Sequence, residues 1–262
     1  MNIHGKIPPL PILHIGGGKE TDFTPSVEAF KQERGIKFVL AFSGGSEDDN
    51  PLLIETVRHT AQEFGINSGE QPERVASIVE RVKDQYVSNI VRDILLPLRG
   101  YHIAVLTGGT AWGVPRIAAQ TAHELGFYTI GVYPATAARK AKNMLPEGML
   151  DLSVCVHPSI GESRWGDESA IYVKLLDAVV IIGGRAGTMV EVAHILKCNE
   201  KSDARVKSIL PVSGTGGTAD KVSFFPGKPE TMRRSVPPEV LQDGKAVFEY
   251  LRRSNLLDDV YD

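Results

Sequence analysis

A carboxylate lies one helical turn beyond a glycine-rich turn in the second half of the chain. Residues 181–191 read Ile-Ile-Gly-Gly-Arg-Ala-Gly-Thr-Met-Val-Glu, which predicts the end of a buried strand, a turn and the start of a helix that carries Glu191. The N-terminus of a helix has unpaired N–H groups and roughly half a positive charge, and glycine lets a phosphate approach the backbone. Glu191 beside such a phosphate can accept a proton from a ribose hydroxyl or from water. The stretch therefore predicts a nucleotide site with an acid in it.

Three more glycine turns follow predicted strands, at residues 43–46, 107–113 and 213–218. The turns that follow parallel strands lie at one edge of the sheet, so they can bind one ligand together. No turn continues into Gly-Lys-Ser or Gly-Lys-Thr, and GxGxxG is absent, so neither a P-loop nor the dinucleotide fingerprint is predicted. The predicted nucleotide- and phosphate-binding residues are Ser43, Gly44, Gly45, Ser46, Thr107, Gly108, Gly109, Thr110, Trp112, Gly113, Gly183, Gly184, Gly187, Thr188, Gly214, Gly216 and Gly217.

Each of these features also has a structural interpretation. Tight turns need glycine for their backbone geometry alone, and the hydroxyl of Thr188 can cap its helix without meeting a ligand. Glu191 can complement the helix dipole, and the ring of Trp112 can pack in the core instead of stacking on a base. The recurrence of the turn after four strands favours a binding site over four unrelated turns.

The elements that position these residues alternate along the chain. Continuous apolar runs predict strands that are buried on both faces, and charged segments with apolar residues at helical spacing predict the helices between them. The repeated order of strand, glycine turn and helix indicates an α/β fold with a doubly wound parallel sheet, Rossmann-like, whose ligands bind at the carboxyl ends of the strands. The predicted strands are residues 36–42, 102–106, 128–133, 152–156, 178–182 and 208–212, and the predicted helices include residues 51–64, 70–95, 118–125, 169–176, 188–196 and 238–253.

The length of the chain favours one large domain with a small appendage. Residues 1–35 are predicted to form an N-terminal arm, and residues 36–262 a single Rossmann-like nucleotide-binding domain. The apolar run at residues 10–15 is interpreted either as an extra edge strand or as part of an arm over the body. The helical insertion at residues 51–95 is a candidate lid or dimer face.

The composition disfavours several classes of protein. With 262 residues and a formal net charge of -3, the chain has no overall attraction for polyanions, so neither nucleic acid nor a membrane is predicted as a partner. Cys155 and Cys198 are far apart and lack metal-ligand spacing, and His14, His102 and His194 are expected to be core or surface residues. No metal site and no cofactor are therefore predicted. The first residues lack the apolar core of a secretory signal, which favours a cytoplasmic protein.

The glycine turns resemble those of a known family. Residues 183–191 resemble the PGGxGTxxE motif of the SLOG superfamily of Rossmann-like proteins, which includes the LONELY GUY (LOG) phosphoribohydrolases, also described as lysine decarboxylase-like proteins. Residues 108–113 and 130–134 resemble the GGGxxGLMG helix start and the IGVIP strand of the family, and residues 42–46 resemble its FxGS turn. The chain is identified as a divergent member, with a resemblance that covers residues 36–196. The resemblance implies a fold of the SLOG type and a homodimer or a higher homo-oligomer.

The resemblance also implies hydrolysis of the N-glycosidic bond of a nucleoside 5'-monophosphate, a small-molecule nucleotide, without a cofactor. In the family, the glutamate that matches Glu191 works with an arginine at the start of the preceding helix, where this sequence has Glu168. Arg185 and Arg164 are nearby replacements, so the predicted catalytic residues are Glu191, Arg185 and Arg164. The alternative is a non-catalytic SLOG sensor or carrier of a nucleotide-derived ligand of the ADP-ribose type. A DNA-processing protein of the same superfamily is disfavoured by the charge.

Overall fold

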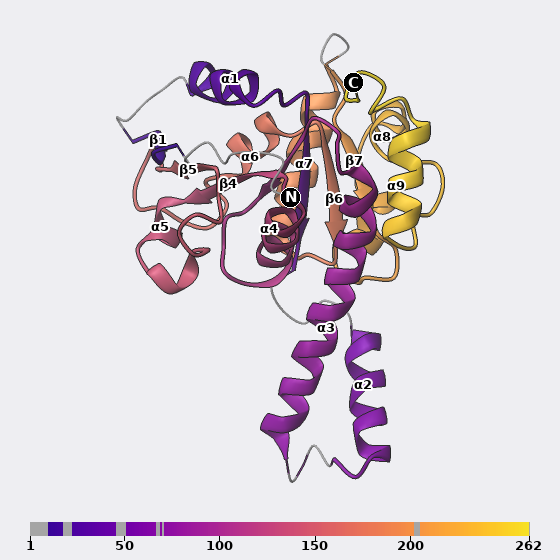
Figure 1. Ribbon diagram of the computed structural model, residues 1–262. Coiled ribbons are helices and arrows are strands. Elements are labelled where there is room, and N and C mark those ends of the chain that lie inside the picture. Colours follow the sequence, from indigo (N-terminus) through magenta and orange to yellow (C-terminus); the bar gives the residue numbers. More distant parts are fainter. Residues whose placement is uncertain are drawn as a thin grey trace.

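The computed structural model describes residues 10–17, 23–45, 51–66, 69, 71–201 and 205–261. Within these residues, seven strands form one sheet in the order β1-β5-β4-β3-β2-β6-β7, and every neighbouring pair is parallel (Figure 1). The predicted α/β fold with a doubly wound parallel sheet is confirmed. The strands are β1 (Leu13–Ile15), β2 (Phe38–Gly44), β3 (Ile103–Thr107), β4 (Tyr128–Pro134), β5 (Leu152–Val156), β6 (Ala178–Ile182) and β7 (Ser208–Pro211).

The buried strands contribute side chains alternately to two cores. In β2, Phe38, Leu40 and Phe42 belong to one core, and Val39 and Ala41 belong to the other. Successive side chains of a strand point to opposite faces of the sheet, so a strand that is covered on both faces must be apolar throughout. This explains why the strands could be recognised as continuous apolar runs. All six predicted strands are present, with bounds within two residues of the prediction.

Helices cover both faces of the sheet (Figure 1). One core contains side chains from α1 (Thr24–Glu33), α6 (Ser169–Leu175) and α7 (Ala186–Asn199). The opposite core contains side chains from α3 (Pro72–Leu95), α4 (Gly113–Leu125) and α9 (Gly244–Arg253). Among the described residues, no helix is both long enough and apolar enough to cross a membrane. The remaining elements are the helices α2 (Pro51–Glu63), α5 (Ala135–Ala138) and α8 (Pro229–Ser235) and the 3-10 turns η1 (Leu96–Leu98), η2 (Ala141–Asn143) and η3 (Ala219–Phe224).

Helix α2 and the first half of α3 form a hairpin that extends away from the sheet (Figure 1). The two helices share a small apolar cluster of Ile54, Val75 and Val79, which is separate from the two large cores. The last part of α3 instead packs against one face of the sheet, through residues such as Ile90 and Ile94. The hairpin is the predicted helical insertion, and its use as a lid or a dimer face stays a prediction.

The segment predicted as an N-terminal arm contains a strand and a helix. Strand β1 pairs with β5 at the edge of the sheet, which confirms the edge-strand interpretation of this run. Helix α1 places Val27 and Phe30 in the core, together with Phe23 just before the helix. These contacts attach residues of the arm to the sheet. Where the arm ends and the domain begins stays a prediction.

The last helix is shorter than the sequence predicts and begins at Gly244 rather than near residue 238. Asp243 has an extended backbone and accepts the N–H of Ala246 on its carboxylate at 2.8 Å, so it is the N-cap of α9. Leu241, just before the cap, forms a parallel bridge with Val212 beyond β7. The start of the predicted helix is therefore used as an extended segment beside the sheet.

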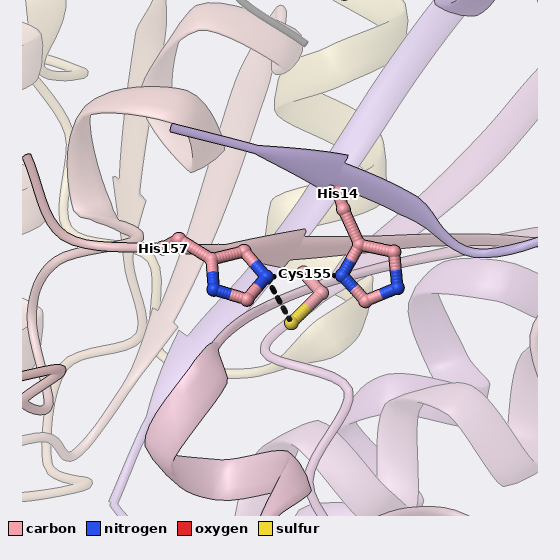
Figure 2. Close-up of side chains that lie close together, drawn as sticks. All are labelled: His14, Cys155 and His157. Carbon is pink, nitrogen blue, oxygen red and sulfur yellow. Dashed lines mark hydrogen bonds between the residues drawn. The ribbon is translucent and has the colours of Figure 1, made fainter. Parts of the chain in front are cut away.

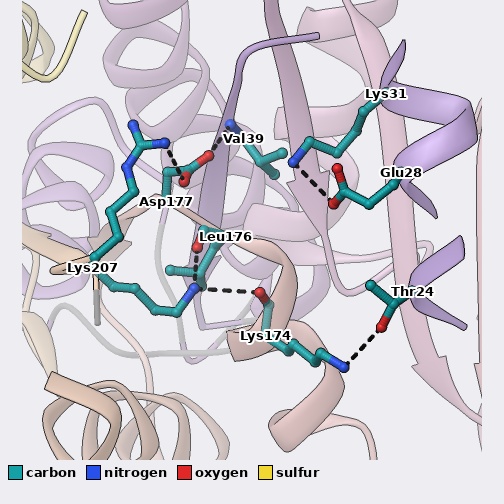
Figure 3. Close-up of polar contacts among 9 residues, drawn as sticks. Thr24, Glu28, Lys31, Val39, Lys174, Leu176, Asp177 and Lys207 are labelled. Carbon is teal, nitrogen blue, oxygen red and sulfur yellow. Dashed lines mark hydrogen bonds and ion pairs between the residues drawn. The ribbon is translucent and has the colours of Figure 1, made fainter. Parts of the chain in front are cut away.

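Polar contacts lie at the amino ends of β2, β6 and β7 (Figure 3). Asp177 precedes β6, and its carboxylate accepts the backbone N–H of Val39 in β2 at 2.8 Å. Lys207 precedes β7 and donates from Nζ to the carbonyls of Leu176 and Lys174 at the end of α6, at 2.6 and 3.3 Å. Burial lowers the pKa of the Lys207 ammonium. These charged groups therefore serve the fold, by satisfying backbone groups at this end of the sheet.

Candidate functional site

A pocket of about 230 Å³ lies at the carboxyl ends of β2 and β6. The two strands are neighbours, and the chain leaves them in opposite directions, because β3 follows on one side and β7 on the other. Doubly wound sheets bind ligands at such a switch point, because the loops on its two sides separate and leave a crevice. The pocket is lined by Phe42, Ser43, Gly44, Gly45, Gly108, Thr110, Trp112, Pro115, Trp165, Glu168, Tyr172, Arg185, Gly187, Thr188 and Glu191.

Glu191 lies on α7 in the wall of this pocket. Ser43, at the end of β2, donates a hydrogen bond from its Oγ to Oε2 of Glu191, and the same Oγ lies 3.3 Å from the hydroxyl of Thr188. Burial raises the pKa of Glu191 to about 7; the hydrogen bond from Ser43 opposes this shift, and the negative charge of Glu168 adds to it. A carboxyl group with a pKa near neutrality can both give and take a proton, as general acid–base chemistry requires.

Glu168 brings a second carboxyl group to the same pocket. It is the N-cap residue of α6, and its Oε2 accepts the N–H of Gly166 at 2.8 Å. Burial raises the pKa of Glu168, backbone hydrogen bonds oppose the shift, and the charge of Asp167 adds to it. The position that the resemblance gives to an arginine therefore lies in the pocket and carries an acid there.

The two predicted catalytic arginines differ in position. Arg185 lines the pocket with an exposed side chain. Arg164 is also exposed, but it is not part of the pocket wall, and its backbone N–H donates to Oδ2 of Asp167 at 2.8 Å. The neighbouring Trp165 lines the pocket instead, with its ring 6.1 Å from that of Trp112 and tilted by 58°. The pocket wall thus includes a pair of indole rings, of which the sequence predicted one.

The first turn of α7 reaches the pocket through Gly187 and Thr188. Helix α7 begins at Ala186, and the first N–H groups of a helix have no acceptor within it. An added Cβ on Gly187 would meet no described atom within 4 Å, so the backbone is accessible there. Gly184 has a φ of +94°, and a Cβ on it would lie 2.5 Å from the hydroxyl of Thr188, so this position requires glycine. The start of α7 therefore leaves its backbone open to the pocket.

The turn between β3 and α4 offers fewer N–H groups than its sequence suggests. The N–H of Gly109 donates to Oγ1 of Thr107 at 3.2 Å, and the N–H of Val114 donates to the carbonyl of Gly45 at 3.3 Å. Pro115, the next residue in the helix, has no N–H. This turn therefore contributes its surface to the pocket more than its amides.

The loop after β7 supports the turn after β6. Oγ1 of Thr215 accepts the N–H of Gly183 at 2.8 Å, and the N–H of Thr218 donates to the carbonyl of Gly184 at 2.7 Å. The two backbones are so close that a Cβ on Gly217 would lie 2.2 Å from the carbonyl oxygen of Gly184. Residues 215–218 thus hold the glycine turn in position from behind.

The other two glycines of this loop use their amides locally. Gly214 and Gly216 donate their N–H groups to the carboxylate of Asp220, at 2.7 and 3.1 Å. Neither residue lines the pocket. The structure therefore does not bring these two predicted phosphate-binding residues to the pocket.

The predicted site residues fall into groups. Ser46 lies outside the described residues. Gly113 and Gly183 line a smaller neighbouring cavity of about 50 Å³, and Thr107, Gly109 and Gly184 belong to the turns without lining either space. The predicted residues that meet in the large pocket are Ser43, Gly44, Gly45, Gly108, Thr110, Trp112, Arg185, Gly187, Thr188 and Glu191.

Tyr172 is a pocket residue that the sequence did not single out. Its hydroxyl donates to the carbonyl of Phe42 at 2.9 Å, which fixes the end of β2 just before Ser43. Burial, and next the negative charge of Glu191, raise the pKa of Tyr172 far above its ordinary range, so the phenol stays a donor. Its position four residues after Glu168, one turn along α6, is the sequence signal that could have located it.

The comparisons with known proteins agree with the resemblance. Residues 91–202 match the model of the SLOG cluster4 family, which confirms the resemblance to the SLOG superfamily over this part of the chain. That segment contains β3 to β6, both indole rings and Glu191. No curated protein matches the sequence significantly.

Solved structures are similar to this chain at low sequence identity. The X-ray structure of TM1055, from a structural genomics consortium, has a TM-score of 0.51 and 18% sequence identity, covering 82% of this chain and 99% of that one. A molybdenum cofactor binding protein from the phototrophic bacterium Rippkaea orientalis has a TM-score of 0.48 and 18% identity, covering 82% of this chain and 96% of that one. At this identity, the likeness to TM1055 shows a common α/β fold.

Proposed function

We propose that the chain binds a nucleotide, or a small molecule derived from one, in the pocket at the ends of β2 and β6. The observation that carries this proposal is the position of Glu191, which is held by Ser43 and lies one helical turn from the accessible start of α7. A helix start binds phosphate, and a nearby carboxylate accepts hydrogen bonds from ribose hydroxyls. One helical turn, about 5.4 Å along the axis, separates the two, which suits the adjoining phosphate and ribose of a nucleoside phosphate.

The remaining pocket residues support the same ligand. Trp112 and Trp165 supply aromatic surface on which a base can stack, and Trp165 is 55% exposed, so it has surface to bury. Arg185 can approach the phosphate from the exposed side, where a guanidinium forms charge-assisted hydrogen bonds. In this arrangement the phosphate lies at Gly187 and Thr188, and the ribose lies near Glu191.

Hydrolysis of the N-glycosidic bond is a second candidate function, favoured by the pair of carboxyl groups with raised pKa values. Glycosidic bonds are cleaved by two carboxyl groups, because one can move a proton while the other stabilises the positive charge that develops on the sugar. Here Glu191 would take a proton from water as the water oxygen bonds to C1', while the C1'–N bond breaks and its electron pair leaves with the base, which takes up a proton. If this step does not occur, the pocket is that of a sensor or carrier.

A paired assay of binding and turnover tests both functions. The purified chain is incubated with AMP, CMP, GMP, IMP, UMP and ADP-ribose, while thermal shift measures binding and chromatography measures release of the base. We expect at least one of these compounds to raise the melting temperature. Base release with the same compound would establish hydrolysis, and a shift without base release would establish the sensor or carrier. If no compound has either effect, the proposal fails.

Two matched variants connect the result to the pocket. Glu191→Gln replaces the carboxylate that would accept a hydrogen bond from the ribose, and loss of one charged hydrogen bond to the ligand reduces affinity by roughly 10- to 100-fold. Glu200→Gln changes an acid that pairs with Lys197 at the other end of α7, and should leave binding unchanged. Equal affinity in Glu191→Gln and in the unmodified chain would show that the ligand binds elsewhere.

The homo-oligomer and the cytoplasmic location also stay predictions. Light scattering of the purified chain measures the first, since a homodimer would have twice the mass of one chain, 28.5 kDa. The same measurement on a chain without residues 51–71 would show whether the hairpin is the dimer face.

A further inference from the structure

Three side chains of metal-ligand type meet at the edge of the sheet, away from the pocket described above (Figure 2). Nδ1 of His14 lies 3.0 Å from Nε2 of His157, and Sγ of Cys155 lies 3.9 Å from the same nitrogen. All three ligand atoms lie within 4.8 Å of one another. None of the three residues contributes to the wall of the nucleotide pocket.

The pairing of two strands produces this cluster. His14 in β1 is the register partner of Cys155 in β5, so their side chains lie on the same face of the sheet. His157 comes two residues after Cys155, on that face again, and its N–H donates to the carbonyl of Ile15 at 2.7 Å, which continues the pairing. The three side chains are therefore brought together by the backbone and not by chance contact on the surface.

The backbone beside the cluster is packed closely as well. Gly16 has a φ of +80°, and a Cβ on it would lie 2.3 Å from the carbonyl oxygen of His157. Glycine at this position is what allows the end of β1 to approach the loop after β5. The approach keeps the two imidazoles at their present separation.

The geometry matches a tetrahedral metal site. Bond lengths to zinc of about 2.0–2.1 Å for nitrogen and 2.3 Å for sulfur place the ligand atoms of a tetrahedron roughly 3.3–3.6 Å apart. Two of the separations, 3.0 and 3.9 Å, lie on either side of this range, and all three ligand atoms lie within 4.8 Å of one another, so adjustments of about an ångström or less bring them to coordination distance. We propose that His14, Cys155 and His157 bind a divalent cation of the zinc class, with solvent in the fourth position.

The donor set and its exposure determine what kind of ion fits. One sulfur and two imidazole nitrogens favour zinc and exclude magnesium and calcium, which prefer oxygen ligands. Cys155 is 3% exposed, whereas His14 is exposed, so the sulfur lies on the protein side and the other side is open to water. Three protein ligands with an open position differ from the closed, four-ligand arrangement of purely structural zinc sites.

Binding of the ion would join β1 to the rest of the sheet. Strand β1 has three residues and, within the described part of the chain, pairs with β5 alone, so its attachment rests on few hydrogen bonds. An ion that binds the folded state but not the separated strand stabilises the folded state in proportion to its concentration. Zinc should therefore raise the melting temperature of the protein, independently of any nucleotide.

Cobalt(II) is the probe for this site, because it replaces zinc and reports both a tetrahedral geometry and a thiolate ligand by absorption. The full chain, without an affinity tag, is treated with a chelator and titrated with cobalt(II), then with zinc by calorimetry. We expect one equivalent to bind, a thiolate-to-cobalt charge-transfer band to appear, and zinc to displace the cobalt. Titration with magnesium should produce no heat from this site.

Four variants assign the ligands. His14→Ala and Cys155→Ser should each weaken zinc binding at least tenfold, and Cys155→Ser should also remove the charge-transfer band. His59→Ala and Cys198→Ser replace an exposed histidine and an exposed cysteine elsewhere, and should bind as the unmodified chain does. His14→Ala changes an exposed side chain, so it keeps the test valid if Cys155→Ser does not fold. Absence of a thiolate band in the unmodified chain, or unchanged binding in His14→Ala, would overturn the proposal.

Discussion

A partly buried acid lies near each end of strand β6, and the two acids have different surroundings. At the amino end, the carboxylate of Asp177 accepts the N–H of Val39 at 2.8 Å and lies 3.5 Å from Nη1 of Arg205. At the carboxyl end, the carboxyl group of Glu191 meets the hydroxyl of Ser43 and the negative charge of Glu168, and its pKa is raised to about 7. The first acid is matched by a backbone donor and a cation, and the second is placed beside another acid.

The difference separates a group that serves the fold from one that is available to a ligand. A carboxylate that satisfies a backbone N–H and pairs with a cation stabilises the folded state. A carboxyl group kept near neutral pKa by burial and a like charge destabilises the folded state whenever it ionises. Such a cost is typical of functional sites, where a ligand can later compensate it.

The largest expected effect comes from Glu191→Gln. The pKa of Glu191 is about 7 in the folded chain and has an ordinary value of 4.5, so the folded state binds the proton more tightly than the unfolded state. The stability that the protonated carboxyl group contributes is therefore present in full below pH 4.5 and is lost as the pH rises through 7. This loss lowers the free energy of unfolding by up to about 3 kcal/mol. The glutamine stays neutral, so at pH 8 the variant should be more stable than the unmodified chain.

Urea unfolding between pH 5 and pH 8 measures this difference. The free energy of unfolding of the unmodified chain should decline over this interval more steeply than that of Glu191→Gln. Glu200→Gln, at the far end of the same helix, is the control, and its slope should follow that of the unmodified chain. Parallel slopes for the unmodified chain and Glu191→Gln would remove the contrast between the two ends of β6.

An effect of intermediate size is expected at the amino end. Asp177→Ala removes the acceptor of the buried Val39 N–H, which costs about 1–3 kcal/mol. Asp177→Asn keeps an acceptor oxygen and should cost less. Both variants should keep the ligand affinity of the unmodified chain, measured by the assay described above on the folded protein. A folded Asp177→Ala chain that no longer bound ligand would show that the two ends of the strand are not separate in function.

The smallest of the three effects is expected for Glu168→Gln. The charge of Glu168 adds to the raised pKa of Glu191, so its removal should lower that pKa toward the ordinary value without reaching it. The decline of stability with pH should then begin at a lower pH and be smaller in total than in the unmodified chain. Urea unfolding over the same pH interval measures this, and an unchanged profile would mean that the two carboxyl groups do not interact.

The sequence was sufficient for the parts of the fold that depend on local pattern. Strands such as β2 are apolar on both faces, so they could be recognised without knowledge of their neighbours. The glycine turns also follow from local pattern, because Gly184 must adopt a positive φ. Ten predicted residues consequently meet in one pocket.

The parts that were missed depend on which partner each group meets in the folded chain. Whether a backbone N–H of a turn is available to a ligand cannot be read from the sequence of the turn. The N–H groups of Gly214 and Gly216 donate to Asp220, and that of Val114 donates to Gly45. The contact between His14 and His157 spans 143 positions and depends on the register of β1 against β5. The one local sign of that cluster was the spacing of Cys155 and His157, which are two residues apart at the end of a predicted strand.

The hairpin of α2 and α3 has a consequence for variation in length. Its apolar cluster, Ile54, Val75 and Val79, is independent of both large cores, so the outer part can lose or gain whole helical turns without repacking the sheet. Paired insertions of seven residues in the two helices would keep the same sides facing each other, since seven residues make nearly two turns. Over evolutionary time, the length of this hairpin is therefore free to change while the pocket at the ends of β2 and β6 keeps its shape.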